Sequence, residues 1–472
     1  MNANAFHTST IRHSLPSPMS SRNILGPASG SASTSTKIKS LNHNVAFSRS
    51  ISPSISTSVT TTKSSTTSLQ ALLNPVVLTA ALGATSKLLS AIGIGALATP
   101  SGPKQFGRIL DGNAVAALSK LTYWLFQPCF LLCGVASTLA KASSPSSSAA
   151  GAAAGGVPTN ALLLLPLASL IQISLGSIAA KIVTTKKFGI RPALLGIDTD
   201  DDAGANDIKM CTTFANSGPL PLILTDALFS GTILSDVAAC ISFYLLVWSP
   251  LFWTLGKSVL GLNDDSGTTQ KNNSIIASFV KQVKAFLSPP VIGSILGVII
   301  GSNEILRNLL LSPSGALAPL FGSLKTFGVA YLPSAILVLA GSLVKERNKS
   351  PSTTGSDSKK SSSLSPKTII SILMCRFILS PIIALATVRL MTLAKIMPVD
   401  NARTLAIVTF TLLMEGCMPP AQNSVILLNL ANEKERASKM AKMLTVIYSL
   451  SAIPVTLLLS GCLSISGILG FA

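Results

Sequence analysis

The polar residues best placed to do chemistry lie in a short stretch near the C-terminus. Glu415 is a carboxylate, and Gln422 and Asn423 are carboxamides, within an otherwise apolar segment. Pro419 and Pro420 lie between them and remove two backbone donors, so a helix should break there. Backbone groups freed at membrane depth are tolerated only where protein buries them or a wet cavity receives them. The combination predicts a transport site; the alternative is a kinked helix whose polar side chains satisfy only its own backbone.

A second interrupted segment strengthens the transport interpretation. The apolar span 210–229 carries at its centre the residues Asn216, Ser217, Gly218, Pro219 and Pro221. Proline-interrupted spans in corresponding positions of two halves are the best sequence indication of a transporter site.

The two breaks together suggest how a ligand is bound. Asn216, Gln422 and Asn423 can donate amide hydrogens to an anion, and half-helices starting after each break would aim their positive ends at it. This favours a carboxylate-bearing substrate. Glu415 is the only acidic residue deep within a span, and a low-dielectric site favours its neutral form. It is therefore our candidate for proton coupling, the alternative being a structural carboxylate that pairs with Arg376 or Arg389.

Composition indicates a polytopic membrane protein. Of 472 residues, 48% are hydrophobic and only 11% charged, against about 25% charged in a typical soluble protein. The net charge of +19 comes mostly from loops between apolar spans, so topology explains it and nucleic-acid binding is not expected. All three histidines precede the first span. We therefore expect no enzyme active site, no metal site and no cofactor; the partners are the bilayer and a small anion, with a homodimer left open.

Residues 1–70 have the composition of an organelle transit peptide. They are rich in Ser and Thr, contain Lys and Arg, and have no Asp or Glu. The excess of Ser and Thr over Arg favours a plastid envelope location. A disordered tail is the alternative.

Ten apolar spans follow, and their prolines suggest a repeat. We predict a first five-span repeat over 71–260, a polar linker over 261–283 and a second repeat over 284–466 with a disordered loop at 345–366. Similar Pro-containing segments recur about 200 residues apart, and an odd number of spans per repeat gives inverted topology. The predicted spans are 72–99, 114–139, 161–183, 210–229, 233–255, 286–305, 318–344, 369–393, 405–430 and 440–463.

Four motifs in order resemble one known family. LSKLTYWLFQP (118–128), FANSGPLPL (214–222), PPVIGSILG (289–297) and EGCMPPAQN (415–423) are similar to segments of the auxin efflux carrier, or membrane transport protein, family, in its PIN-like branch. The resemblance covers residues 84–465. In place of the Asn that is common in the PIN-like motif, this chain has Pro219.

The resemblance implies an all-α polytopic membrane protein of ten transmembrane helices, built as two inverted five-helix repeats with broken, crossing fourth and ninth helices. It implies elevator-like carriage of an auxin-like organic anion, with Asn216, Pro219 or Pro221, Pro419, Pro420 and Asn423 at the crossover. PIN-like relatives are associated with the endoplasmic reticulum, which is the alternative location. A sodium-coupled carrier of bile-acid type and a dicarboxylate permease are the alternative functions.

Overall fold

The computed structural model describes residues 75–100, 102–103, 109–142, 156–185, 202–262, 287–343, 366–398 and 401–471. These form helices joined by short turns, with no strand among them beyond one isolated bridge. The predicted transit peptide, most of the 261–283 linker and most of the 345–366 loop lie outside the described residues.

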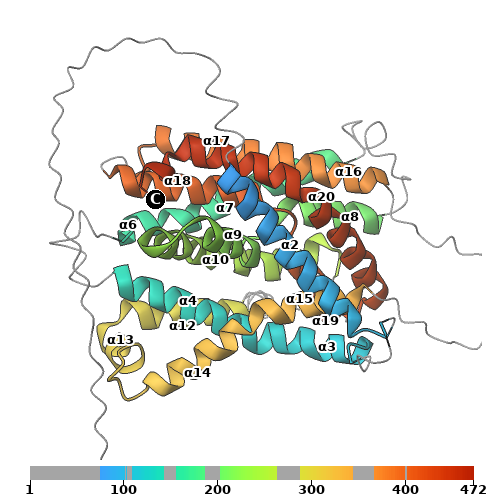
Figure 1. The fold of residues 1–472 in the computed structure, drawn as a ribbon, viewed down its shortest axis with the longest axis horizontal. Helices are drawn as coiled ribbons and strands as arrows, with labels where there is room; N and C mark the ends of the chain where they lie inside the picture. The colour runs from blue at the N-terminus through green and yellow to red at the C-terminus, as the bar shows by residue number, and fades with distance from the viewer. Residues whose placement is uncertain are drawn as a thin grey trace, which may run out of the picture. The chain divides into compact units, whose positions relative to one another are not determined.

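The described helices form two layers (Figure 1). The lower layer contains α3 (Gly112–Leu121), the π-helix η2 (Thr122–Phe126), α4 (Gln127–Ala142), α12 (Pro289–Ser302), α13 (Glu304–Leu310), α14 (Ala318–Val329) and α15 (Tyr331–Ser342). The upper layer contains α6 (Thr159–Leu162), α7 (Leu164–Thr184), α8 (Asp202–Thr213), α9 (Pro219–Leu228), α10 (Gly231–Val259), α16 (Pro366–Met374), the π-helix η5 (Cys375–Leu379), α17 (Ser380–Leu393), α18 (Ala402–Gly416) and α20 (Lys434–Ser466).

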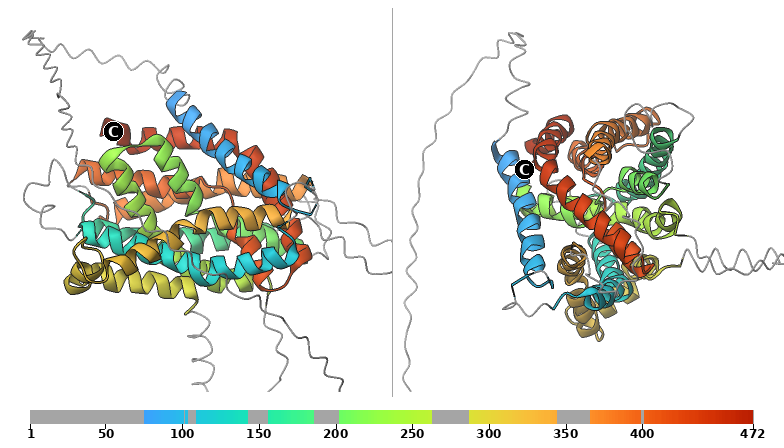
Figure 2. Two further views of the ribbon diagram at one scale, coloured as in Figure 1. Left: turned by 60° about the horizontal axis from the view of Figure 1, so that its bottom comes forward. Right: turned by 90° about the vertical axis from the view of Figure 1, so that its right-hand side faces the viewer.

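Two helices link the layers. Helix α2 (Pro75–Leu97) lies obliquely across the others and contacts α15 of the lower layer and α9 and α20 of the upper one (Figures 1 and 2). Helix α19 (Asn423–Leu430) contacts both α20 and α3.

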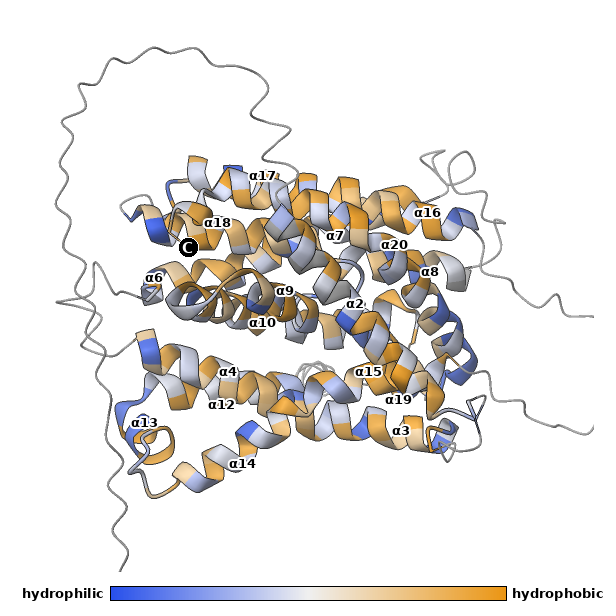
Figure 3. Ribbon diagram, in the orientation of Figure 1, coloured by the Kyte–Doolittle hydropathy of each residue, from blue (hydrophilic) through white to orange (hydrophobic). Residues whose placement is uncertain are grey.

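Among the described residues, six helices are long and apolar enough to cross a membrane, or seven if α12 and α13, bent by 102°, form one span. They correspond to the predicted second, third, fifth, seventh, eighth and tenth spans, and the bent pair to the sixth. Figure 3 shows hydrophobic residues along most of α16 and α17. The protein is thus an all-helical polytopic membrane protein. The predicted first, fourth and ninth spans correspond to α2, α8–α9 and α18–α19, whose helices do not meet that test alone.

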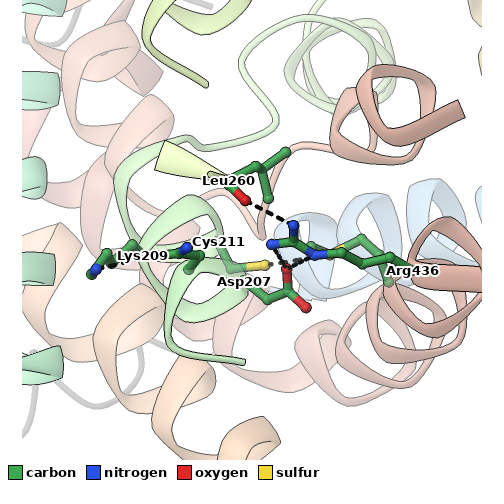
Figure 4. A network of polar contacts seen from close by, with 7 residues as sticks. Asp207, Lys209, Cys211, Leu260 and Arg436 are labelled. Atoms are coloured by element: carbon green, nitrogen blue, oxygen red, sulfur yellow. Dashed lines mark hydrogen bonds and ion pairs between the residues drawn. The ribbon is translucent and has the colours of Figure 1, made fainter. Parts of the chain in front are cut away.

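Helix α8 starts before the apolar segment predicted as the fourth span. That segment begins at residue 210, whereas α8 begins at Asp202. The first turns of α8 read as a loop because they are polar, yet Asp207 is buried and its carboxylate oxygen accepts hydrogen bonds from Arg436 of α20 at 3.0 and 2.7 Å (Figure 4). A further Arg436 nitrogen donates to the carbonyl of Leu260, which follows α10, at 2.7 Å.

A second ion pair joins two other helix starts of the upper layer. Arg403 of α18 lies 2.6 Å from the carboxylate of Asp236 in α10. Each of the two pairs therefore links a helix of the first predicted repeat to a helix of the second, with the acidic residue contributed by the first repeat.

Glycines allow the lower layer to pack closely. Gly293, Gly297 and Gly301 lie one turn apart on α12, and an added Cβ at each would collide with α4, which contributes backbone atoms of Pro128, Leu132 and Ala136 at these contacts. Small residues at four-residue spacing let membrane helices approach at backbone distance. Helices α4 and α12 therefore form the centre of this layer.

Candidate functional site

The two chain breaks are bonded to each other. Between α8 and α9 and between α18 and α19 the backbone is extended, and the two stretches run antiparallel. The amide of Asn216 donates to the carbonyl of Pro419 at 2.8 Å, and the amide of Ala421 donates to the carbonyl of Phe214 at 3.0 Å. Backbone groups that each break would leave unpaired are thus satisfied by the other break. We call this joint the crossover.

The prolines have different local roles at the two breaks. Pro219 is the first residue of α9, where its fixed φ suits a helix start and its missing N–H would have no helical partner. Pro419 and Pro420 lie in the extended stretch before α19, and the carbonyl of each accepts a hydrogen bond. Pro219 therefore starts helix α9, whereas Pro419 and Pro420 prevent helix α18 from continuing.

A small cavity lies on one side of the crossover, and five of the nine predicted binding residues line it: Asn216, Gly218, Pro219, Gln422 and Asn423. It has room for about one water molecule. The other four, Ser217, Pro221, Pro419 and Pro420, are buried in the crossover without lining this cavity.

Several polar groups around this crossover cavity have no hydrogen-bond partner within the described part of the chain. They are both amide atoms of Gln422, Oε1 of Gln127, Nε1 of Trp248 and the hydroxyl of Ser249. A buried polar group without a partner is costly, so native proteins seldom keep one without a reason. Three of these groups can donate, which suits a ligand that accepts hydrogen bonds.

The two asparagines at this cavity are held in place instead. The amide nitrogen of Asn423 donates to the Tyr331 hydroxyl at 2.8 Å, and that of Asn216 donates to the Tyr448 hydroxyl at 3.1 Å. Tyr448 in turn donates to the carbonyl of Pro420 at 2.7 Å. These bonds fix the shape of the crossover, so the asparagines contribute geometry as well as polar atoms.

The remaining wall of the crossover cavity is apolar. Phe130 of α4 stacks on Tyr331 of α15 with ring centres 5.1 Å apart, and Leu131 and Leu245 complete the lining. A ligand bound here would meet neutral donors on one side and aromatic or aliphatic surface on the other.

Glu415 lies in a different cavity, on the other side of the crossover. It is 1% exposed, and neither carboxylate oxygen has a partner among the described residues. The same cavity is lined by Arg376, Gln172 and Tyr244, and it also has room for about one water molecule. The Tyr244 hydroxyl donates to the Gln172 side-chain oxygen at 2.9 Å. The predicted proton-coupling residue is therefore separate from the residues that line the crossover cavity.

A larger cavity of about 390 Å³ continues along the same helix faces. The crossover cavity is lined by Gln127 and Leu131 of α4 and the larger one by Gly134, Thr138 and Lys141, at helical spacing on the same face. On α10 the lining continues from Trp248 and Leu245 to Ser242 and Ser235. We call this larger cavity the vestibule. It lies between the two layers, and Lys141 and Asp236 are its charged lining residues.

Sequence reasoning missed several residues of the crossover cavity: Gln127, Phe130, Leu131, Leu245, Trp248, Ser249, Tyr331 and Ala421. Four of them carried a local signal, because Gln127, Tyr331, Trp248 and Ser249 each lie one or two residues before a mid-span proline. The others come from helices whose apolar pattern is the same whether they face a ligand or a neighbour.

Comparison with known proteins agrees with this architecture. A family model described as membrane transport protein matches residues 200–459, which include both breaks of the crossover. The chain belongs to the membrane transport protein family. Three relatives in Arabidopsis thaliana are Protein PIN-LIKES 7 (26% identical, over 30% of this chain and 31% of that protein), Protein PIN-LIKES 5 (24%, over 37% and 39%) and Protein PIN-LIKES 1 (22%, over 74% and 72%).

This family member is in the PIN-like branch, as the four sequence motifs predicted. The first two relatives are matched over less than half of their length, and the third over nearly three quarters. The family and the membrane helices identify an integral membrane protein of a transport family.

Proposed function

We propose that this protein is a secondary carrier of a small organic anion with one carboxylate and an apolar body, of which the auxin indole-3-acetate is the type. The main support is the set of unpartnered donors at the crossover cavity: the Gln422 amide, the Trp248 indole N–H and the Ser249 hydroxyl. A carboxylate accepts several hydrogen bonds and would satisfy them. Phe130 and Leu131 would then contact the apolar body.

Helix ends add to the attraction for an anion. Helix α9 begins at Pro219 and α19 at Asn423, and both residues line the cavity. The N-terminus of a helix carries partial positive charge and free amide groups. Two such ends at one cavity favour a negatively charged ligand.

The neutral character of the cavity favours a monocarboxylate over a dicarboxylate. None of the described residues that line it is Lys or Arg. A second carboxylate would need a further cationic or strongly donating partner to offset its desolvation. We therefore rank the dicarboxylate permease below the carrier of monocarboxylates.

We further propose ten spans in two inverted repeats, with α2, α8–α9 and α18–α19 as the first, fourth and ninth. Three observations support this. The breaks of α8–α9 and α18–α19 pair with each other, and each break follows a helix of the upper layer. The two ion pairs join the fourth span to the tenth and the fifth span to the ninth, a reciprocal arrangement of the two halves. Binding at the interface of broken helices is typical of repeat-built transporters.

Movement of one layer against the other would provide access. The crossover cavity is too small for an organic anion, whereas the vestibule that extends it along the α4–α10 interface is large enough for one. A shift of the upper layer, which carries the crossover, would open and close this connection. We assign proton coupling to Glu415, which lies in the last turn of α18 beside the crossover.

The test is uptake into proteoliposomes with indole-3-acetate, benzoate and succinate as probes. We expect saturable uptake of the two monocarboxylates, stimulation by an imposed pH gradient, and little uptake of succinate. Asn423→Ala should lose uptake, and Glu415→Gln should lose the response to the gradient. Normal uptake of every probe by both variants would overturn the site assignment, and uptake that depends on sodium would favour the bile-acid-type alternative.

The subcellular location of the protein is a separate proposal. The Ser- and Thr-rich, acid-free composition of residues 1–70 supports the plastid envelope, with the endoplasmic reticulum as the alternative. Fusion of residues 1–70 to a fluorescent protein tests it: import into plastids is expected, and a diffuse cytosolic signal would reject the transit peptide.

A further inference from the structure

A buried arginine at the crossover has no role in the proposed anion site. Arg376 is 3% exposed and lines the cavity that contains Glu415. Its Nε and one terminal nitrogen donate to the carbonyl of Met418 at 3.1 and 2.7 Å, and the other terminal nitrogen donates to the carbonyl of Thr212 at 3.0 Å. A guanidinium is always charged and is expensive to bury, so its position needs a reason.

Its two acceptors mark the C-terminal ends of the two interrupted half-helices. Thr212 is in the last turn of α8, and Met418 follows the last residue of α18, Gly416, by two positions. The last carbonyls of a helix lack helical partners and carry partial negative charge. At the crossover, two such ends therefore point their carbonyls at one place.

In carriers with broken helices, unwound carbonyls and half-helix C-termini bind the coupling cation. The same type of site exists here, and the guanidinium of Arg376 fills it. Glu415 lines the same cavity, so the surroundings contain a carboxyl group as well as carbonyls. The carbonyls and the carboxyl group are the ligands expected of a site for a small cation, and the cation that occupies it is the Arg376 side chain.

The helix that contains Arg376 has a widened turn at this residue. Arg376 lies in the π-helix η5, whose last residue, Leu379, is two positions before Pro381. A proline ring crowds the carbonyl four residues earlier and cannot donate to it, which favours a wider turn at that point. Short π segments inside α-helices are frequent at functional sites.

We propose that Arg376 is a resident cation of the crossover that takes the place of an exchangeable one. The carrier then needs no sodium or potassium ion. Removal of the guanidinium opens a cation site between α8 and α18, and a small monovalent cation in solution, above all guanidinium itself, fills it. This inference deepens the proposed function by fixing how the carrier is coupled, but the cation site exists whatever the transported anion.

The first experiment measures cation binding without any substrate. Purified native protein, Arg376→Ala and the control Arg389→Ala, whose arginine is exposed on α17, are heated in low-millimolar guanidinium, sodium or choline chloride at matched ionic strength. We expect guanidinium to raise the midpoint of unfolding of Arg376→Ala only. An equal response of all three proteins, or no response of a folded Arg376→Ala, would overturn the proposal.

The second experiment measures uptake of indole-3-acetate in the same salts. Native uptake should be equal in sodium and choline, and Arg376→Ala should lose about tenfold or more, as expected when hydrogen bonds from a charged group are removed, and regain part of it with guanidinium. Native uptake or thermal stability that rises with sodium overturns the inference, even if Arg376→Ala does not fold. Failure of every anion to be transported would count against the proposed function alone, since the thermal measurement does not depend on it.

Discussion

Two neighbouring residues of the crossover are expected to differ in what they contribute. Gln422 and Asn423 are both carboxamides, and both line the crossover cavity. The Asn423 amide is bonded to Tyr331, whereas neither amide atom of Gln422 has a partner among the described residues. We therefore assign Asn423 mainly to the architecture and Gln422 mainly to the ligand.

This assignment predicts opposite effects on stability. Gln422→Leu should reduce indole-3-acetate uptake by roughly tenfold or more while leaving thermal stability unchanged or higher, because an apolar side chain replaces an unsatisfied polar one. Asn423→Leu should reduce both, because it leaves the Tyr331 hydroxyl without its amide partner. Uptake and unfolding temperature, measured on the same preparations, separate the two. A destabilised Gln422→Leu would contradict the assignment.

Lys141 is expected to attract anions at the vestibule. Its ammonium is exposed, 3.0 Å from the Ser235 hydroxyl, and lines the cavity. Lys141→Gln should raise the apparent KM for indole-3-acetate by roughly two- to fivefold with little change in maximal rate, since an exposed charge contributes modestly and is screened by salt. Lys257, exposed in the last turn of α10, is the control. A KM change that is independent of salt would argue against an electrostatic role.

The sequence predicted the breaks well and the lining poorly, for physical reasons. A proline disrupts the helix within one turn of its own position, so Pro219 and Pro419 predict a helix break from the local sequence alone. The partner of each break, by contrast, is about 200 residues away, and no local pattern specifies it. Arg376 illustrates the same limit: we considered it as an ion-pair partner of Glu415, and its guanidinium instead donates hydrogen bonds to backbone carbonyls.

Two of the membrane helices contain a π-helical turn next to a proline. The π-helix η2 ends two residues before Pro128, just as η5 ends two residues before Pro381. Both widened turns are next to cavities: Gln127 follows the first and Arg376 lies in the second. The mid-span prolines that suggested a repeat therefore also shape the helices that reach the crossover.

The close packing of the α12 glycines Gly293, Gly297 and Gly301 against α4 can be tested by substitution. Gly297→Leu should destabilise the protein by about 1–3 kcal/mol or more, because the backbone of α4 leaves no room for a side chain. Gly322→Leu in α14 is the matched control, since a Cβ there would meet nothing within 4 Å. Thermal unfolding in detergent measures both. Equal losses of stability would show that α4 and α12 are not packed as closely as described.

For the whole molecule, the interface between α4 and α10 is where the two layers should slide. A Cβ on Gly134 of α4 would lie 4.0 Å from the Cβ of Ser242 in α10, a separation that a disulfide can span. Gly134→Cys with Ser242→Cys should therefore stop uptake on oxidation and recover it on reduction.

The control for that cross-link lies within one layer. A Cβ on Gly341 of α15 would lie 3.7 Å from the Cβ of Val115 in α3, so a disulfide between cysteines at these positions joins two helices of the lower layer. Uptake should then be unaffected by oxidation. If the first cross-link left uptake intact, relative movement of the layers along α4 and α10 would be excluded.

The joint between the two halves consists of main-chain atoms, and this has a practical consequence. Because the hydrogen bonds between residues 214–216 and 419–421 use amides and carbonyls, they place no demand on the side chains that face the cargo. The side chains at positions such as 422 and 249 can therefore be substituted to suit other ligands without weakening the hydrogen bonds of the crossover. A designer who wanted a carrier for a different acid would change the lining and leave the joint alone.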